Sequence, residues 1–142
     1  RYLVAKSGVI ITKILTTKKN GDINYLIADA GMQTLIRPAL YNSYHRVEAL
    51  NDLDKKENQY TLAGPICESS DIIAKHINLP KQKINNYIAI HDVGAYGAVM
   101  ASNYNSRGIP AEILINKSQF SLIHKEENIA DTIKRDLIPD WL

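Results

Sequence analysis

An Asn-Gly pair at positions 20 and 21 is the feature that most constrains the fold of this chain. Residues 2–17 before the pair are rich in valine, isoleucine and threonine, and residues 23–28 after it are mostly apolar. Such runs are typical of β-strands. Asn-Gly is favoured in tight hairpin turns because both residues tolerate a positive φ. The pattern therefore predicts two antiparallel strands joined by a turn at residues 18–22.

Further short runs of the same kind follow along the chain. The expected strands, each bounded by turn or polar residues, are 45–50, 60–63, 86–90, 111–115 and 118–123. The expected brief helices are 36–41, 71–75 and 98–102. A closing amphipathic helix is expected at 126–137, where Ile129, Ile133 and Leu137 recur at helical spacing. This pattern predicts one mainly β domain, a β-sandwich or Greek-key barrel with short helices.

Composition and charge exclude several classes of protein. Of the 142 residues, 45% are hydrophobic and 23% are charged, as in an ordinary soluble domain with one core. The net charge is +2 and the lysines are scattered, so the basic face that nucleic acid requires is missing. No apolar run is long enough for a membrane span, and no signal peptide is evident. The single cysteine excludes an internal disulfide and suits a reducing compartment, so we expect a cytoplasmic protein.

Residues 64–71, Gly-Pro-Ile-Cys-Glu-Ser-Ser-Asp, form the first candidate site. The Gly-Pro pair favours a turn after the expected strand, and Ser69, Ser70 or Asp71 could cap the expected helix that follows. Cys67 and Glu68 would then lie on a loop, where catalytic groups often collect. A lone cysteine is more often a small buried apolar residue. By itself the loop therefore predicts only that a thiol and a carboxylate are neighbours.

Two further segments carry candidate binding groups. Arg37 and Tyr41 lie four positions apart in the expected helix 36–41, so they share one of its faces. Residues 94–97 place Tyr96 between two glycines, which permit a close approach of the backbone to a ligand. The four histidines lack the spacing of metal ligands, and no metal site is expected.

Three segments occur in one order along the chain: Ile-Arg-Pro-Ala-Leu-Tyr at 36–41, Cys-Glu-Ser-Ser-Asp at 67–71 and Gly-Ala-Tyr-Gly at 94–97. In this order they resemble the carboxy-terminal β domain of the diaminopimelate decarboxylase family, the alanine-racemase-like, group IV pyridoxal-phosphate decarboxylases. Residues 29–32 and 102–107 look like the same family. Any one segment is a weak signal, whereas their joint occurrence is specific and covers nearly the whole chain.

The resemblance implies an enzyme that uses pyridoxal 5'-phosphate to convert meso-2,6-diaminopimelate to L-lysine and carbon dioxide, in lysine biosynthesis. In the family, an amino-terminal α/β barrel carries the lysine that holds the cofactor, and the β domain closes the active site. The family works as a homodimer with shared active sites. Because the chain begins at Arg1 without a methionine, we expect residues 1–142 to be the β domain alone and to be inactive without the barrel.

The resemblance also implies roles for single residues. Cys67 matches the family cysteine that donates a proton to the site of the neighbouring subunit, and a thiol is a suitable donor. Glu68 matches the carboxylate that recognises the distal ammonium group of the substrate. Arg37 matches the arginine that binds the distal carboxylate, with a hydroxyl added by Tyr41. Tyr96 matches the tyrosine that contacts both cofactor and substrate.

Arg1 is the remaining candidate residue. The family has a Glu-Pro-Gly-Arg stretch beside the cofactor phosphate, and residues 1–4 look like its end. The resemblance therefore implies contact of Arg1 with substrate or cofactor. His91, next to the second glycine-containing loop, has no role that the sequence indicates.

Other functions remain open at this point. The nearest is a related decarboxylase of ornithine, arginine or carboxynorspermidine, although ornithine-type relatives usually carry aspartate where Glu68 stands. Substrates without a distal carboxylate would also have no use for Arg37. A second alternative is a non-catalytic β-sandwich binding module that has kept the loops. A third, a cysteine nucleophile served by His45 or His91, lacks a helix-borne cysteine signature.

Overall fold

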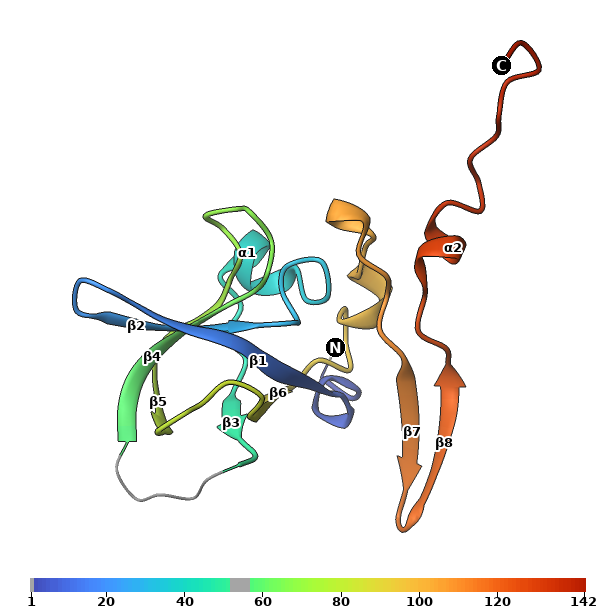
Figure 1. The fold of residues 1–142 in the computed structure, drawn as a ribbon. Helices are drawn as coiled ribbons and strands as arrows, with labels where there is room; N and C mark the ends of the chain where they lie inside the picture. The colour runs from blue at the N-terminus through green and yellow to red at the C-terminus, as the bar shows by residue number, and fades with distance from the viewer. Residues whose placement is uncertain (1, 52–56) are drawn as a thin grey trace. The chain divides into compact units, whose positions relative to one another are not determined.

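The structure is a computed structural model that describes residues 2–51 and 57–142 of the chain. The chain forms two compact units, Arg1–Ala101 and Ser102–Leu142 (Figure 1). In both units strands are the main regular secondary structure, which confirms the predicted mainly β fold class. Among the described residues, no helix is long and apolar enough to cross a membrane.

The first unit is built on a six-stranded sheet with the strand order β3-β6-β1-β2-β4-β5. Its strands are β1 (Val9–Asn20), β2 (Ile23–Ala28), β3 (Val47–Ala49), β4 (Glu57–Ala63), β5 (Ile72–Pro80) and β6 (Tyr87–His91). Neighbouring strands are antiparallel except β2 and β4, which are parallel. The edge strands β3 and β5 also contact each other, so the sheet nearly closes into a barrel.

The Asn-Gly turn forms the predicted hairpin between β1 and β2. Asn20 lies opposite Ile23 in the register, and Gly21 has a φ of 57°. Glycine adopts this left-handed conformation without steric cost. The Asn-Gly pair was therefore enough to predict this turn. Further from the turn, an irregularity between Ile14 and Thr16 interrupts the register of β1.

Aliphatic side chains from four strands form the centre of the core. Ile14, Leu26, Leu62, Ile88 and Ile90 are fully buried and belong to one cluster. Burial of each such side chain stabilises the fold by about 1.5–3 kcal/mol relative to exposure. Because β1, β2, β4 and β6 contribute to this cluster, it fixes the strands from which the candidate loops leave.

The predicted helix at residues 36–41 is confirmed as α1 (Arg37–Tyr41). Pro38 stands in its first turn, where its missing N–H has no cost. The helix ends at Asn42, which is left-handed with a φ of 50°. α1 contacts β5, so it lies beside the strand that follows the cysteine loop. The helix expected at 98–102 is only a single 3-10 turn, Ala98–Met100.

The prediction of a helix at residues 71–75 is wrong, because strand β5 begins at Ile72 and occupies most of this segment. The strand begins at Ile72 and pairs antiparallel with β4 along its length. Ile73 and Leu79 are buried in the core. β-Branched side chains pack well on a sheet, and pairing with β4 supplied backbone hydrogen bonds that a capping signal could not reveal. Asp71 therefore does not cap a helix.

The second unit contains one hairpin. The strands expected at 111–115 and 118–123 are confirmed as β7 (Glu112–Asn116) and β8 (Gln119–His124), and the two strands pair antiparallel. Lys117 in the connecting turn has a φ of 55°, so this turn also uses the left-handed region. A short 3-10 segment, Tyr104–Ser106, precedes this hairpin.

The closing helix expected at residues 126–137 is reduced to α2 (Ile129–Thr132). The prediction of a helix over residues 126–137 is therefore wrong. Ile129, Ile133 and Leu137 are 76%, 56% and 90% exposed. A short helix in water is unstable unless an apolar face packs against other residues, and here that face is not covered.

His91 takes part in a small polar network at the edge of the sheet. Its Nε2 lies 2.9 Å from Oε2 of Glu48 on β3. Nη1 of Arg46 donates to the same oxygen at 2.7 Å. Two contacts hold the pKa of Glu48 below its usual value of 4.5. The hydrogen bond from Arg46 has the larger effect, and the contact with His91 adds to it. His91 thus has a structural partner that the sequence did not reveal.

We expect Glu48→Gln to lower stability at neutral pH but not in acid. A carboxylate whose pKa is lowered by folding stabilises the fold above its unfolded pKa, and this contribution is lost as the pH falls through the folded pKa. The difference in free energy of unfolding between wild type and Glu48→Gln should be small, because the network is exposed. This difference should be greatest at about pH 7 and vanish below about pH 3. Urea denaturation at several pH values measures it, and a difference independent of pH would exclude the carboxylate as its cause.

Candidate functional site

Arg37, at the start of α1, lies between two tyrosine rings. Its guanidinium carbon is 5.1 Å from the centroid of the Tyr41 ring and 5.3 Å from the centroid of the Tyr96 ring. Tyr41 stands on the same helix, as the spacing predicted, whereas Tyr96 comes from the loop after β6. A guanidinium is attracted to aromatic faces at such distances. The structure thus brings together three of the predicted site residues.

The charge of Arg37 has little compensation from the protein. The residue is buried, with 8% of its surface exposed. Its Nη2 donates a long hydrogen bond of 3.4 Å to Oγ of Ser43. None of the ion pairs found in residues 2–51 and 57–142 includes Arg37. Because a buried charge without an opposite partner is costly, this arrangement suits a bound carboxylate, which a guanidinium can hold with two parallel hydrogen bonds.

The loop that carries Tyr96 is held in an unusual conformation. Tyr96 has a φ of 63°, which is uncommon for a residue with a large side chain. The N–H of Gly94 donates to the carbonyl of Ala5 at 2.9 Å, and a side chain at Gly94 would collide with the carbonyl oxygen of Val4. Packing against the amino-terminal turn therefore keeps Tyr96 in a conformation that it does not prefer. Its ring is half-exposed and accessible to a ligand.

Cys67 and Glu68 lie on the loop between β4 and β5, and both are exposed. The residues that flank them are anchored: Ile66 is 7% exposed and Asp71 is 2% exposed. The exposed thiol does not fit the common case of a cysteine that only fills a core. The loop instead presents a thiol and a carboxylate on its surface.

The predicted site residues do not all form one cluster. In the described part of the chain, no hydrogen bond or ring contact joins Cys67 to Arg37 or Tyr96. Arg1, the remaining candidate, lies outside the described residues. The contacts of the described residues thus define an arginine-tyrosine cluster of Arg37, Tyr41 and Tyr96, and they do not include Cys67.

The histidines are engaged elsewhere. Nδ1 of His45 lies 3.0 Å from the carbonyl oxygen of His91, and the ring of His91 contacts Glu48. Neither contact involves Cys67, so the geometry does not support a cysteine-histidine nucleophile. In residues 2–51 and 57–142, no group of three or more histidine, cysteine, aspartate or glutamate residues could hold a metal ion.

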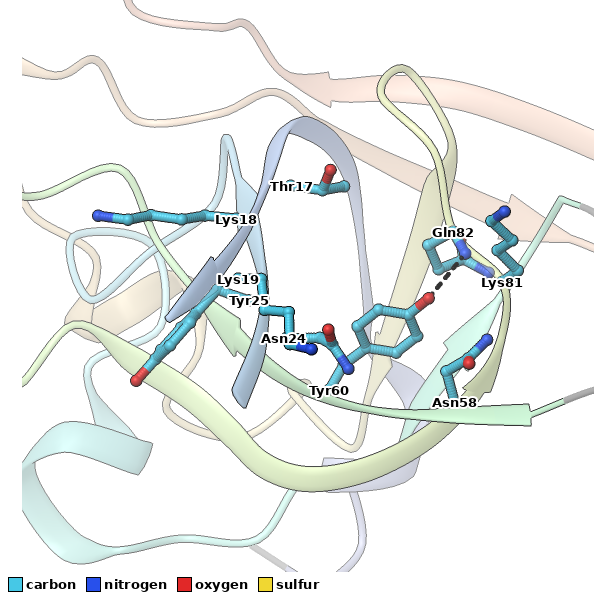
Figure 2. Close-up of a pocket in the computed structure, with 9 residues that line it drawn as sticks. All are labelled: Thr17, Lys18, Lys19, Asn24, Tyr25, Asn58, Tyr60, Lys81 and Gln82. Atoms are coloured by element: carbon cyan, nitrogen blue, oxygen red, sulfur yellow. Dashed lines mark hydrogen bonds between the residues drawn. The ribbon is translucent and has the colours of Figure 1, made fainter. Parts of the chain in front are cut away.

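A polar hollow of about 470 Å³ lies on the first unit, beside the β1–β2 hairpin (Figure 2). The N–H of Gln82 donates to the hydroxyl of Tyr60 in its wall at 3.2 Å. The ammonium group of Lys18 points away from the Tyr60 ring, so the lysines of the hollow do not converge. Its lining residues are Thr17, Lys18, Lys19, Asn24, Tyr25, Asn58, Tyr60, Lys81 and Gln82. None of the predicted site residues lines this hollow.

Sequence reasoning missed two residues that shape the site. Ser43 is the hydrogen-bond partner of Arg37, and it follows α1 with no motif to mark it. Asp71, one of three candidate helix caps, instead closes the cysteine loop and binds that loop's backbone. Its position at the end of the Cys-Glu-Ser-Ser-Asp motif was the available signal.

The fold and the site together define a class: a nearly closed β domain that presents a buried arginine between two tyrosine rings and an exposed thiol loop. Residues 1–94 match the family described as "Pyridoxal-dependent decarboxylase, C-terminal sheet domain". The chain therefore belongs to the family of carboxy-terminal sheet domains of pyridoxal-dependent decarboxylases. The resemblance predicted from the three loops is confirmed at the level of this family.

The chain is also similar to individual members of this family over almost its whole length. The chain is 43% identical over 143 residues to diaminopimelate decarboxylase of Archaeoglobus fulgidus, a match that covers 100% of this chain and 34% of that relative. It is 39% identical over 150 residues to diaminopimelate decarboxylase of Escherichia coli K12, with 97% and 36% covered. The solved diaminopimelate decarboxylase of M. jannaschii in complex with L-lysine has a TM-score of 0.94 and 37% identity, with 99% and 32% covered. The chain thus spans about one third of the length of these relatives.

Proposed function

We propose that the protein containing this chain decarboxylates meso-2,6-diaminopimelate to L-lysine and carbon dioxide, with pyridoxal 5'-phosphate as cofactor. The observation that carries the proposal is Arg37, buried between Tyr41 and Tyr96 and outside every ion pair of the described residues. Meso-diaminopimelate has a second carboxylate far from its reacting centre. A bidentate contact with a guanidinium would select a substrate that carries this group.

Recognition of the distal end of the substrate is divided between two charges. Arg37 binds the distal carboxylate, and Tyr41, which is 58% exposed, adds a hydroxyl from the same helix. Glu68, exposed on the cysteine loop, binds the distal ammonium group. Two opposite charges at fixed positions would select both the identity and the configuration of the distal centre.

Cys67 holds the proton that the product carbon receives. When bound, pyridoxal phosphate withdraws electrons from the carbon that loses carbon dioxide. That carbon must then be protonated, and a thiol is a suitable acid because it is protonated at neutral pH yet gives up its proton readily. The exposure of Cys67 supports this role, since a donor has to reach the substrate.

The residues of this chain fit a cofactor contact. Tyr96 offers a hydroxyl on a half-exposed ring beside Arg37, in a loop whose glycine allows close backbone packing. We assign Tyr96 to contact with both cofactor and substrate, and Arg1 to the phosphate side of the cofactor or to the substrate. The lysine that holds the cofactor belongs to the barrel of the full-length protein, so the chain by itself should be inactive.

In the described residues the exposed Cys67 makes no hydrogen bond or ring contact with Arg37, which is compatible with a shared active site. An exposed thiol that does not contact its own arginine cluster can serve the cluster of a second copy. The enzyme would then be a homodimer in which each site takes Cys67 and Glu68 from one subunit and Arg37 from the other. We place it in the cytoplasm, where thiols remain reduced.

The full-length protein is expected to turn over meso-diaminopimelate at least about 100-fold faster than ornithine, arginine or carboxynorspermidine, measured as kcat/KM for release of carbon dioxide. The reason is that a buried arginine left without a carboxylate penalises each of those substrates. Faster turnover of ornithine would favour the related decarboxylases. Binding of substrate and cofactor without any turnover would favour the non-catalytic binding module.

A further inference from the structure

Asp71 is the most deeply buried acidic residue near the cysteine loop, with 2% of its surface exposed. A buried carboxylate is costly unless it is hydrogen-bonded, so its contacts should account for its position. The residue closes the segment 64–71 that carries Cys67 and Glu68. Its surroundings therefore bear on how those two side chains are held.

The two oxygens of the Asp71 carboxylate bind backbone N–H groups from two different segments. Oδ2 accepts from the N–H of Ile66 at 2.7 Å, inside the cysteine loop. Oδ1 accepts from the N–H of Met32 at 2.6 Å, in the segment after β2. Hydrogen bonds to an ionised acceptor are roughly twice as strong as neutral ones. One side chain thus ties the cysteine loop to a neighbouring segment.

The backbone of Asp71 closes the same loop. Its carbonyl oxygen accepts from the N–H of Gly64 at 3.0 Å, and its N–H donates to the carbonyl of Glu68 at 3.1 Å. The loop is therefore fixed at Gly64 and Ile66, before Cys67, and at Asp71, after Glu68. The exposed residues lie between these fixed points.

Two glycines make room for the carboxylate. A Cβ added at Gly31 would lie 2.7 Å from Oδ1 of Asp71. A Cβ added at Gly64 would collide with the backbone of Gly31 and with the Asp71 carboxylate. Both segments therefore approach the carboxylate more closely than a residue with a side chain would allow. The arrangement depends on Gly31, Gly64 and Asp71 together.

We propose that Asp71 is a positioning residue for the reaction: its carboxylate holds the cysteine loop so that the thiol of Cys67 reaches the product carbon. The proposal rests on the proposed function of Cys67. A misplacement of about 1 Å can cost about 100-fold in rate, so partial loosening of this loop should lower kcat measurably. Asp71 itself touches neither substrate nor cofactor in this role.

The test is Asp71→Asn in the full-length enzyme. Asparagine keeps the size and one acceptor oxygen, but its NH2 group would face one of the two N–H groups. We expect kcat for meso-diaminopimelate to fall about 10-fold. In a Cys67→Ala background the same substitution should have no further effect on kcat, because it acts through the thiol. An equal loss of kcat in both backgrounds would overturn the positioning role.

Asp29→Asn is the matched control. Asp29 also binds a neighbouring strand, since Oγ1 of Thr12 donates to its carboxylate at 2.5 Å and the N–H of Lys13 does so at 3.0 Å. These contacts do not involve the cysteine loop. Asp29→Asn should therefore lower the unfolding temperature and leave kcat close to wild type. If Asp29→Asn lowers kcat as much as Asp71→Asn does, general destabilisation explains both and the proposal fails.

Hydrogen exchange gives a readout that does not depend on activity. In Asp71→Asn, the amide hydrogen of Ile66 or that of Met32 should exchange faster than in wild type. Unchanged exchange at both amides would show that the Asp71 carboxylate does not hold these two segments together. If the wild-type enzyme does not decarboxylate meso-diaminopimelate, the proposed function fails, and the positioning role in that reaction fails with it even if exchange is faster. Should Asp71→Asn not fold, Gly31→Ala displaces the same carboxylate without removing it, and the same dependence on Cys67 is expected.

Discussion

Replacing Cys67 with alanine in the full-length enzyme should lower kcat for meso-diaminopimelate by about 100- to 10,000-fold, the usual contribution of a positioned acid. The thiol is exposed and flanked by anchored residues, so its loss should remove a proton donor without disturbing the core. Cofactor binding, followed by the absorbance of pyridoxal phosphate, should be unchanged. The measurement is the rate of L-lysine formation at saturating substrate.

A control and a stricter test accompany this prediction. Ser121→Ala, on the exposed strand β8, changes a side chain of similar size outside the site and should leave kcat unchanged. Each variant alone is impaired at substrate concentrations near the wild-type KM. At such a concentration, mixing Cys67→Ala subunits with Arg37→Met subunits should restore activity, because one site of each mixed dimer then contains both native residues. An unaltered rate for Cys67→Ala would remove the thiol from the acid role, and a mixture that stays impaired would contradict the shared site.

Replacing Arg37 with methionine should raise KM for meso-diaminopimelate by about 100-fold, because removing one partner of a buried charge pair costs about 2–5 kcal/mol. Methionine fills much of the volume between Tyr41 and Tyr96 but cannot bind a carboxylate. Inhibition by L-lysine, which retains this carboxylate, should weaken by a similar factor. Inhibition by cadaverine, which lacks it, should change little.

The contrast between the two inhibitors makes the Arg37 prediction specific. Arg37→Lys keeps the charge but not the planar fork, so it should recover only part of the affinity for L-lysine. Arg46→Met removes an exposed arginine that pairs with Glu48 and should leave both inhibitors unaffected. If Arg37→Met weakens inhibition by L-lysine and by cadaverine equally, the arginine supports the structure of the site rather than binding the carboxylate.

The elements that were predicted correctly are those specified by neighbouring residues. The hairpin at Asn20 and Gly21 depends on a turn conformation that these two residues favour. The helix that places Arg37 beside Tyr41 depends on a proline in its first turn and on a spacing of four. In both cases the interacting groups are close in sequence, so no distant partner was needed to specify them.

The predictions that failed concern segments whose structure depends on distant partners. Ile72–Pro80 became a strand because β4 was available to pair with it. The helix expected at 126–137 shrank to Ile129–Thr132 because its apolar face is not covered within its own unit. Local propensity could not settle either case, since tertiary packing exceeds it in free energy.

The sequence by itself determined the family, the mainly β class and the identity of the candidate residues, because motifs and turn signals are carried by short stretches of chain. Only the tertiary structure decided that Tyr96, far along the chain, lies over Arg37, and that this arginine is buried. It also showed that the carboxylate of Asp71 binds Met32 and Ile66 rather than capping a helix. The contacts of Tyr96 with Arg37 and of Asp71 with Met32 join residues far apart in sequence, and packing of the sheet, which no local pattern encodes, brings them together.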